Sequence, residues 1–182
     1  MPSANREPVL LAWLDGFTDR IGRGIAWLVV VMMAVQFAIV VMRYVLGIHS
    51  IVMQESVMYM HAMVFMLASA WTLRNDGHVR VDIFYRRLSA RGRAWIDLGG
   101  TLFLLIPVLA FIALSSLGYV TSSWSILERS PDGGIPAVFL LKSLILLMVA
   151  LLMIQAIAQV LRQTLILRGR LPGHTPGHEE VL

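Results

Sequence analysis

Cysteine is absent from this sequence of 182 residues, and Lys142 is its only lysine. Without cysteine the chain cannot form a disulfide framework, a thiolate metal site or a cysteine nucleophile. Charged residues make up only 14% of the chain, whereas 58% of the residues are hydrophobic, against about 45–50% in soluble domains. A chain this small has too few polar residues to cover a soluble core, so we expect the excess apolar side chains to face lipid.

The sequence also lacks the motifs of several enzyme classes. It has no glycine-rich phosphate loop, no Ser/His/Asp constellation and no cluster of metal ligands. We therefore expect no catalytic residue, no metal and no cofactor. The net charge of +4 comes almost wholly from arginine residues that flank apolar segments. This pattern favours contact with membrane lipids and argues against nucleic-acid binding.

Four apolar segments are long enough to cross a bilayer, whose hydrocarbon core needs roughly 20 residues of helix. They predict membrane spans at residues 25–46, 52–73, 95–125 and 135–161. The predicted fold class is therefore an all-α membrane protein with four transmembrane helices, and residues 1–182 form a single membrane domain.

Arginine residues predict how these spans are oriented. The two tails and the loop between the second and third spans lie on one side of a four-span protein, and they hold most of the arginines. The other side carries only Arg43, Arg129 and Lys142. Because cytoplasmic loops are enriched in Lys and Arg, we expect both termini to lie in the cytoplasm.

Three further segments are expected on the cytoplasmic side. Apolar residues recur every three or four positions over residues 8–21, which predicts an amphipathic helix in the interface; a simple extension of the first span fits the same pattern equally well. Residues 78–90 predict a short element on the inner surface. Residues 169–182 contain several Pro, Gly and His residues and predict a disordered tail.

Four charged residues lie near the outer ends of the predicted spans, namely Arg43, Glu55, Glu128 and Lys142. A charge at the bilayer centre costs about 2.5–3.5 kcal/mol, so such residues need partners or water. A short turn would allow Arg43 to pair with Glu55, and the second outer turn would allow Glu128 to pair with Arg129 or Lys142. Their placement favours structural anchoring over a substrate path, since transport sites usually lie near the midplane.

His61 is the only histidine within a predicted span. A haem in a four-helix bundle usually needs two inward histidines on facing helices, and His49 and His78 lie at opposite faces of the membrane. Haem binding is therefore disfavoured. We expect interhelical hydrogen bonds for His61 and for the glutamines within spans, which are Gln36, Gln155 and Gln159.

Several motifs together form a recognisable pattern. They are Arg43-Tyr44, Glu55, Arg74 followed by His78-Val79-Arg80-Val81-Asp82, the stretch from Glu128-Arg129-Ser130 to Gly133-Gly134-Ile135-Pro136, Lys142 and Gln155. Over about residues 27–162 the chain resembles the small membrane subunit, often called the Q subunit, of tripartite ATP-independent periplasmic (TRAP) transporters. The later motifs resemble the mannitol and chloroaromatic-compound branch. One departure is Met53-Gln54-Glu55, where many members have a tryptophan and two acidic residues.

This resemblance implies a non-enzymatic part of a three-part importer in the bacterial inner membrane. A periplasmic substrate-binding protein would capture an organic acid, and a large multi-span subunit would move it inward with a sodium gradient by an elevator-like motion. The small subunit would pack on the static part of the large subunit and help to dock the binding protein. Residues assigned to the subunit interface or to structure are Arg43, Glu55, Arg74, His78, Arg80, Asp82, Glu128 and Lys142.

Two other functions fit the same four spans. The chain could anchor a redox enzyme in the membrane, in which case a haem Soret band would appear in the purified protein. It could instead assemble into a small channel or exporter, in which case vesicles containing this chain alone would show flux. The charges at the outer ends and the lack of a midplane site argue against the channel.

Overall fold

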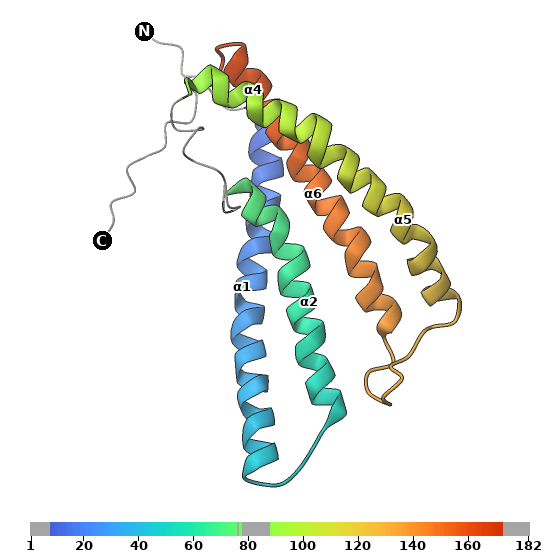
Figure 1. Cartoon of the computed structure of the whole chain (residues 1–182). Helices are drawn as coiled ribbons and strands as arrows, with labels where there is room; N and C mark the ends of the chain where they lie inside the picture. Colours follow the sequence, from blue (N-terminus) through green and yellow to red (C-terminus); the bar gives the residue numbers. More distant parts are fainter. Residues whose placement is uncertain (1–7, 76, 78–87, 173–182) are drawn as a thin grey trace.

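The computed structural model describes residues 8–75, 77 and 88–172 (Figure 1). These residues form helices α1 (Val9–Tyr44), α2 (Ile51–Arg74), α4 (Ala90–Gly100), η1 (Thr101–Leu105), α5 (Ile106–Ser125) and α6 (Val138–Leu167), with no strand within the described ranges. Because α4, η1 and α5 are continuous, the described residues form four helices that are long and apolar enough to cross a membrane. The predicted all-α membrane fold is confirmed.

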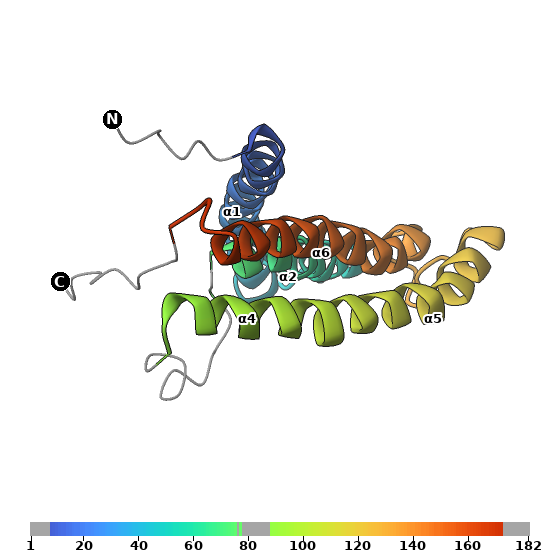
Figure 2. The ribbon, with the colours of Figure 1, turned by 90° about the horizontal axis from the view of Figure 1, so that it is seen from above.

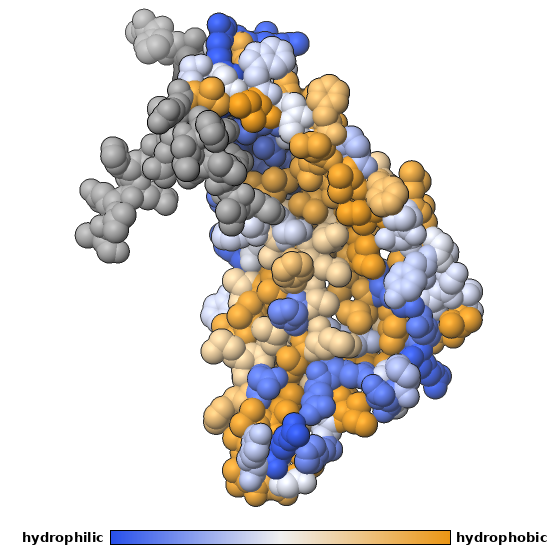
Figure 3. All heavy atoms as spheres, in the orientation of Figure 1, coloured by the Kyte–Doolittle hydropathy of each residue, from blue (hydrophilic) through white to orange (hydrophobic). Residues whose placement is uncertain are grey.

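Large apolar side chains cover the outside of these helices (Figure 3). Among the described residues, six aromatic side chains are at least 70% exposed, and they are Trp27, Phe37, Tyr44, Phe65, Phe103 and Phe111. Water would strongly oppose so much exposed aromatic surface, whereas lipid accepts it. A helix satisfies its own backbone hydrogen bonds, which makes it one of the few structures that can stand in the bilayer core.

Helix α6 is the centre of the bundle (Figures 1 and 2). It contacts α1 and α2 on one side and α4, η1 and α5 on the other. Its buried residues are Val149, Leu151, Gln155, Ala156 and Ala158. The alanines allow neighbouring backbones to approach closely, which is how membrane helices pack when lipid is as apolar as the side chains.

Helix α1 runs without a break from Val9 to Tyr44. The segment that was expected to be either an interfacial helix or an extension of the first span is therefore part of one long helix. Its first turns pack on the bundle, since Leu11 and Leu14 form a buried cluster with Ala158 of α6. The depth of these turns in the membrane stays a prediction.

The third span contains a π-helical turn just before Pro107. Proline has no N–H, and its ring clashes with the carbonyl group four residues earlier, so a regular α-helix cannot pass through it unchanged. The chain accommodates Pro107 by widening over Thr101–Leu105. The continuous helix of 36 residues from Ala90 to Ser125 is about 54 Å long, which exceeds a hydrocarbon core of about 30 Å.

The remaining segment predictions differ in how far the structure describes them. Helix α6 covers Val138–Leu167, whereas the fourth span was predicted at residues 135–161. Most of the inner-surface element predicted at 78–90 lies outside the described residues, including His78, Arg80 and Asp82. Of its last residues, Ser89 caps α4 by accepting a hydrogen bond from the Gly92 N–H at 3.2 Å. Most of the predicted tail, from residue 173 on, also lies outside the described part.

Candidate functional site

A cluster of charged side chains ties together three helices at the end of the bundle that the sequence predicts to face the cytoplasm. Asp15 of α1 is only 4% exposed. Its carboxylate forms an ion pair with Arg74 of α2, whose Nε lies 3.4 Å away, and accepts a hydrogen bond from the Arg162 guanidinium of α6. Arg74 also pairs with Asp19, one turn along α1. We call Asp15, Asp19, Arg74 and Arg162 the inner charge cluster.

A buried polar contact lies one turn further into the bundle. The Thr18 hydroxyl of α1 lies 3.0 Å from Gln155 Oε1 of α6 and 3.2 Å from the carbonyl oxygen of Leu14. Thr18 is 4% and Gln155 2% exposed, so this contact is within the helix packing. The interhelical hydrogen bond predicted for Gln155 is confirmed.

At the opposite end of the bundle, a second charged group holds the end of α5 against α6. Lys142 Nζ donates to Glu128 Oε2 at 2.5 Å, and Ser123 Oγ donates to the same oxygen at 2.6 Å. The Lys142 ammonium also lies 4.0 Å from the centre of the Tyr119 ring, which is a cation–π contact. The hydrogen bond from Lys142, and to a smaller extent the one from Ser123, holds the pKa of Glu128 below its ordinary value, although burial acts in the opposite direction. The sequence predicted that Glu128 pairs with Arg129 or Lys142, and the structure gives Lys142 as the partner.

Glu55 of α2 holds the loop between α5 and α6. Its carboxylate accepts hydrogen bonds from the Ser130 hydroxyl and, at 2.6 Å, from the Ile135 N–H. Gly134 approaches so closely that a Cβ atom there would collide with the carboxylate of Glu55. The hydrogen bond from the Ile135 N–H to Glu55 thus fixes the end of the loop three residues before α6 begins at Val138.

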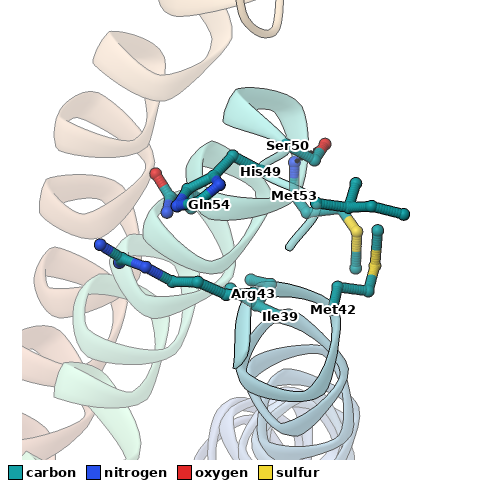
Figure 4. A pocket seen from close by; sticks show the side chains of 8 residues that line it. Ile39, Met42, Arg43, His49, Ser50, Met53 and Gln54 are labelled. Carbon is teal, nitrogen blue, oxygen red and sulfur yellow. Dashed lines mark hydrogen bonds between the residues drawn. The ribbon is translucent and has the colours of Figure 1, made fainter. Parts of the chain in front are cut away.

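The expected Arg43–Glu55 ion pair is wrong, because Glu55 faces the α5–α6 loop. Arg43 instead lies with His49 and Gln54 around a small cavity between the end of α1 and the start of α2 (Figure 4). In Figure 4 the side chains of Arg43, His49 and Gln54 extend to one side of this turn, and Met42 and Met53 lie on the other.

An open groove of about 550 Å³ continues from this turn along α1 and α2. Its walls are Met32, Met33 and Gln36 of α1 and Gln54, Val57, Met58 and His61 of α2. The structure gives the side chains of Gln36 and His61 no hydrogen-bond partner among the described residues. Their expected interhelical hydrogen bonds are therefore not formed within this part of the chain.

The described residues thus provide ion pairs that anchor the helices and an open groove along α1 and α2. Across residues 8–75, 77 and 88–172, no group of three or more His, Asp or Glu side chains could hold a metal ion. Its charged side chains pair with one another at the two ends of the bundle, which fixes helices relative to each other.

A comparison with protein families decides the class of the chain. The model described as "Tripartite ATP-independent periplasmic transporters, DctQ component" matches residues 32–165, which is well over half of the sequence. The chain belongs to this family. It is thus the small subunit of a TRAP transporter, a multi-pass protein of the bacterial inner membrane and not an enzyme. In TRAP systems this subunit works with a large membrane subunit and a periplasmic binding protein. No curated protein and no solved structure matches the chain.

Sequence reasoning found the outer charges of this TRAP subunit but missed the inner charge cluster. Arg74 was assigned a structural role without a partner, and Asp15 and Arg162 were not selected at all. Two signals point to them: Asp15 and Asp19 lie one turn apart and share a helix face, while Arg74 and Arg162 end spans on the same predicted side. Opposite charges at the same membrane face, on helices that must pack, are candidates for pairing.

Proposed function

We propose that this subunit is a static scaffold in a sodium-driven importer of an organic acid, with both of its termini in the cytoplasm. It packs on the large membrane subunit and helps to dock the periplasmic binding protein at its outer end. The family description supports a gradient as the energy source, because an ATP-independent system must draw on something other than ATP hydrolysis. The organic acid and the mannitol-like branch rest on the sequence resemblance alone.

The ion pairs at both ends of the bundle support a static role. The inner charge cluster joins α1, α2 and α6, and the Glu128–Lys142 pair joins the end of α5 to α6. Transport sites in secondary transporters are typically built from interrupted helices near the midplane. The π-helical turn before Pro107 keeps its span continuous, so the described part of this chain has no such interruption.

The anchored α5–α6 loop is the observation that carries the docking role. Glu55 reaches across from α2 and holds the loop through Ser130 and Ile135, while Arg129 and Asp132 remain exposed on it. A loop fixed in this way presents its charges in one geometry. Exposed charges at the rim of an interface mainly set the rate and orientation of association.

Uptake by the three-component system in proteoliposomes tests docking. We expect Glu55→Lys to release the loop and raise the concentration of binding protein needed for half-maximal uptake. Saturating binding protein should restore most of the rate if the subunits still assemble. Asp19→Asn, at the opposite end of the bundle, serves as the control. Unchanged assembly and unchanged uptake in Glu55→Lys would remove the docking assignment.

The same proteoliposomes test the driving force. Replacing external sodium with choline should abolish concentrative uptake, whereas leaving ATP out should have no effect. Uptake that persists without any sodium gradient would refute the sodium-driven part of the proposal.

The positions of the arginine residues support the proposed orientation. The end of the bundle that contains Asp15 also holds several arginines, among them Arg74, Arg91, Arg93, Arg162, Arg168 and Arg170. The opposite end has only three Arg or Lys residues among the described ones, which are Arg43, Arg129 and Lys142. Because the chain has no native cysteine, single cysteines can map its topology cleanly. A membrane-impermeant maleimide added outside should label His49→Cys and should spare Arg168→Cys. The reverse labelling would refute the orientation.

A further inference from the structure

The α1–α2 groove combines apolar walls with polar side chains on one continuous face. On α2, Gln54, Val57, Met58 and His61 recur at steps of three and four residues, so they share one side of the helix. On α1, Met32 and Met33 lie one turn before Gln36. Figure 3 shows hydrophilic patches within the hydrophobic surface over these two helices.

The side chains of Gln36, Gln54 and His61 are exposed to the surroundings of the isolated chain, and none of these side chains has a hydrogen-bond partner among the described residues. An amide or imidazole without a partner in hydrocarbon loses its hydrogen bonds to water and gains nothing in return. Lipid chains offer no donor or acceptor. A lipid-facing position is therefore unfavourable for these three side chains.

Polar side chains on α5 behave differently. Ser115 donates to the Ile112 carbonyl oxygen at 3.2 Å, and Thr121 donates to the Leu117 carbonyl oxygen at 2.8 Å. These hydroxyl groups are satisfied by their own helix and can face lipid at little cost. These two hydroxyl groups on α5 therefore need no further partner, in contrast to Gln36, Gln54 and His61.

The depth of the groove excludes lipid headgroups as that partner. His61 lies ten residues after the start of α2 and thirteen before its end. At 1.5 Å per residue it is about 15 Å from the outer end of the helix, which is close to the centre of a core about 30 Å thick. A helix of another protein can bring a hydrogen-bonding group to that depth.

We propose that the α1–α2 groove receives a membrane helix of the large TRAP subunit, and that this helix carries a polar side chain which hydrogen-bonds Gln36 and His61. The inference rests on the proposed packing of this chain against the large subunit, and it adds which face is used. Met32, Met33 and Met58 suit this contact because unbranched thioether side chains adapt to the shape of a partner.

Photo-crosslinking in the assembled complex tests this assignment. A photoreactive amino acid is placed at Met33 or Met58 in the groove and, as controls, at Phe103 or Phe111 on the exposed face of the third span. We expect the two groove positions to crosslink to the large subunit and the two controls to give no such product.

Substitutions separate polar recognition from packing. Losing a hydrogen bond between membrane helices weakens association by about 0.6–1.7 kcal/mol, which is about three- to twentyfold. We therefore expect His61→Leu and Gln36→Leu each to speed exchange of the small subunit out of the complex by about this factor. His61→Gln keeps a donor and an acceptor and should restore most of the binding.

The outcomes distinguish this inference from the proposed function. If the large subunit co-purifies but crosslinks only through Phe103 or Phe111, the face is wrong and the scaffold role survives. Groove crosslinks to lipid alone or to a second copy of this chain also overturn the assignment. If the large subunit does not co-purify with the unsubstituted chain, both proposals fall.

Discussion

Replacing Asp15 with asparagine would remove the one carboxylate shared by α1, α2 and α6. Its side chain is 6% exposed, while those of Arg74 and Arg162 are 22% and 33% exposed. Removing one partner of a buried ion pair costs about 3–5 kcal/mol, because the other charge is left without compensation. Here Arg74 keeps Asp19 and Arg162 is partly hydrated, so we expect a loss of about 2–3 kcal/mol.

A loss of this size is measurable by heating. For a chain of this length 1 kcal/mol corresponds to about 2–4 °C, so the midpoint temperature should fall by about 4–12 °C in Asp15→Asn. The assay is loss of the monodisperse peak on size-exclusion chromatography in detergent after incubation at increasing temperature. Asp19→Asn is the matched control, since Asp19 is 35% exposed and pairs with only one arginine among the described residues; it should lose about 0.2–1 kcal/mol.

A double substitution tests whether the charges act together. In Asp15→Asn combined with Arg162→Gln, the guanidinium left behind by the first change is gone. The loss should therefore be smaller than the sum of the two single losses. If the midpoint temperature of Asp15→Asn falls no further than that of Asp19→Asn, Asp15 is not the common partner and the reasoning fails. The same holds if the loss of stability in the double substitution equals the sum of the two single losses.

Two further predictions concern helix packing and the outer end. Gly22→Ala would push its new methyl group into the indole ring of Trp71, so we expect a loss of about 1–3 kcal/mol in the same heating assay, whereas Gly24→Ala, which meets nothing within 4 Å, should be neutral. Because the pKa of Glu128 lies below its ordinary value of 4.5 in the folded chain, its stabilising effect is present above that value and is lost as the pH falls through the lowered pKa. Acidification should thus weaken the heat resistance of the unsubstituted chain in this range more than that of Glu128→Gln. Equal effects of the two glycine changes, or an identical pH profile for Glu128→Gln, would contradict the respective contact.

The charged pairs show how far sequence alone can predict contacts. Glu128 and Lys142 flank one short loop, so few arrangements of the chain can keep them apart, and Lys142 was one of the two partners predicted for Glu128. Arg43 and Glu55 also flank a short loop, yet they do not pair. The rotation of α2 about its axis decides which way Glu55 points, and it points to a loop whose Ile135 is 80 positions further along the chain. No local pattern contains that information.

The four spans were determined by the sequence itself, because the number and length of apolar runs depend only on local composition and on the thickness of the bilayer. The tertiary structure decided which helix lies at the centre, and this in turn decided the polar contacts. With α6 between α2 and α5, Arg162 and Gln155 meet α1, while Gln36 and His61 are left on an open face. Helix order and helix rotation are set by packing between segments far apart in the chain, and hydrophobicity alone is nearly the same for every alternative order.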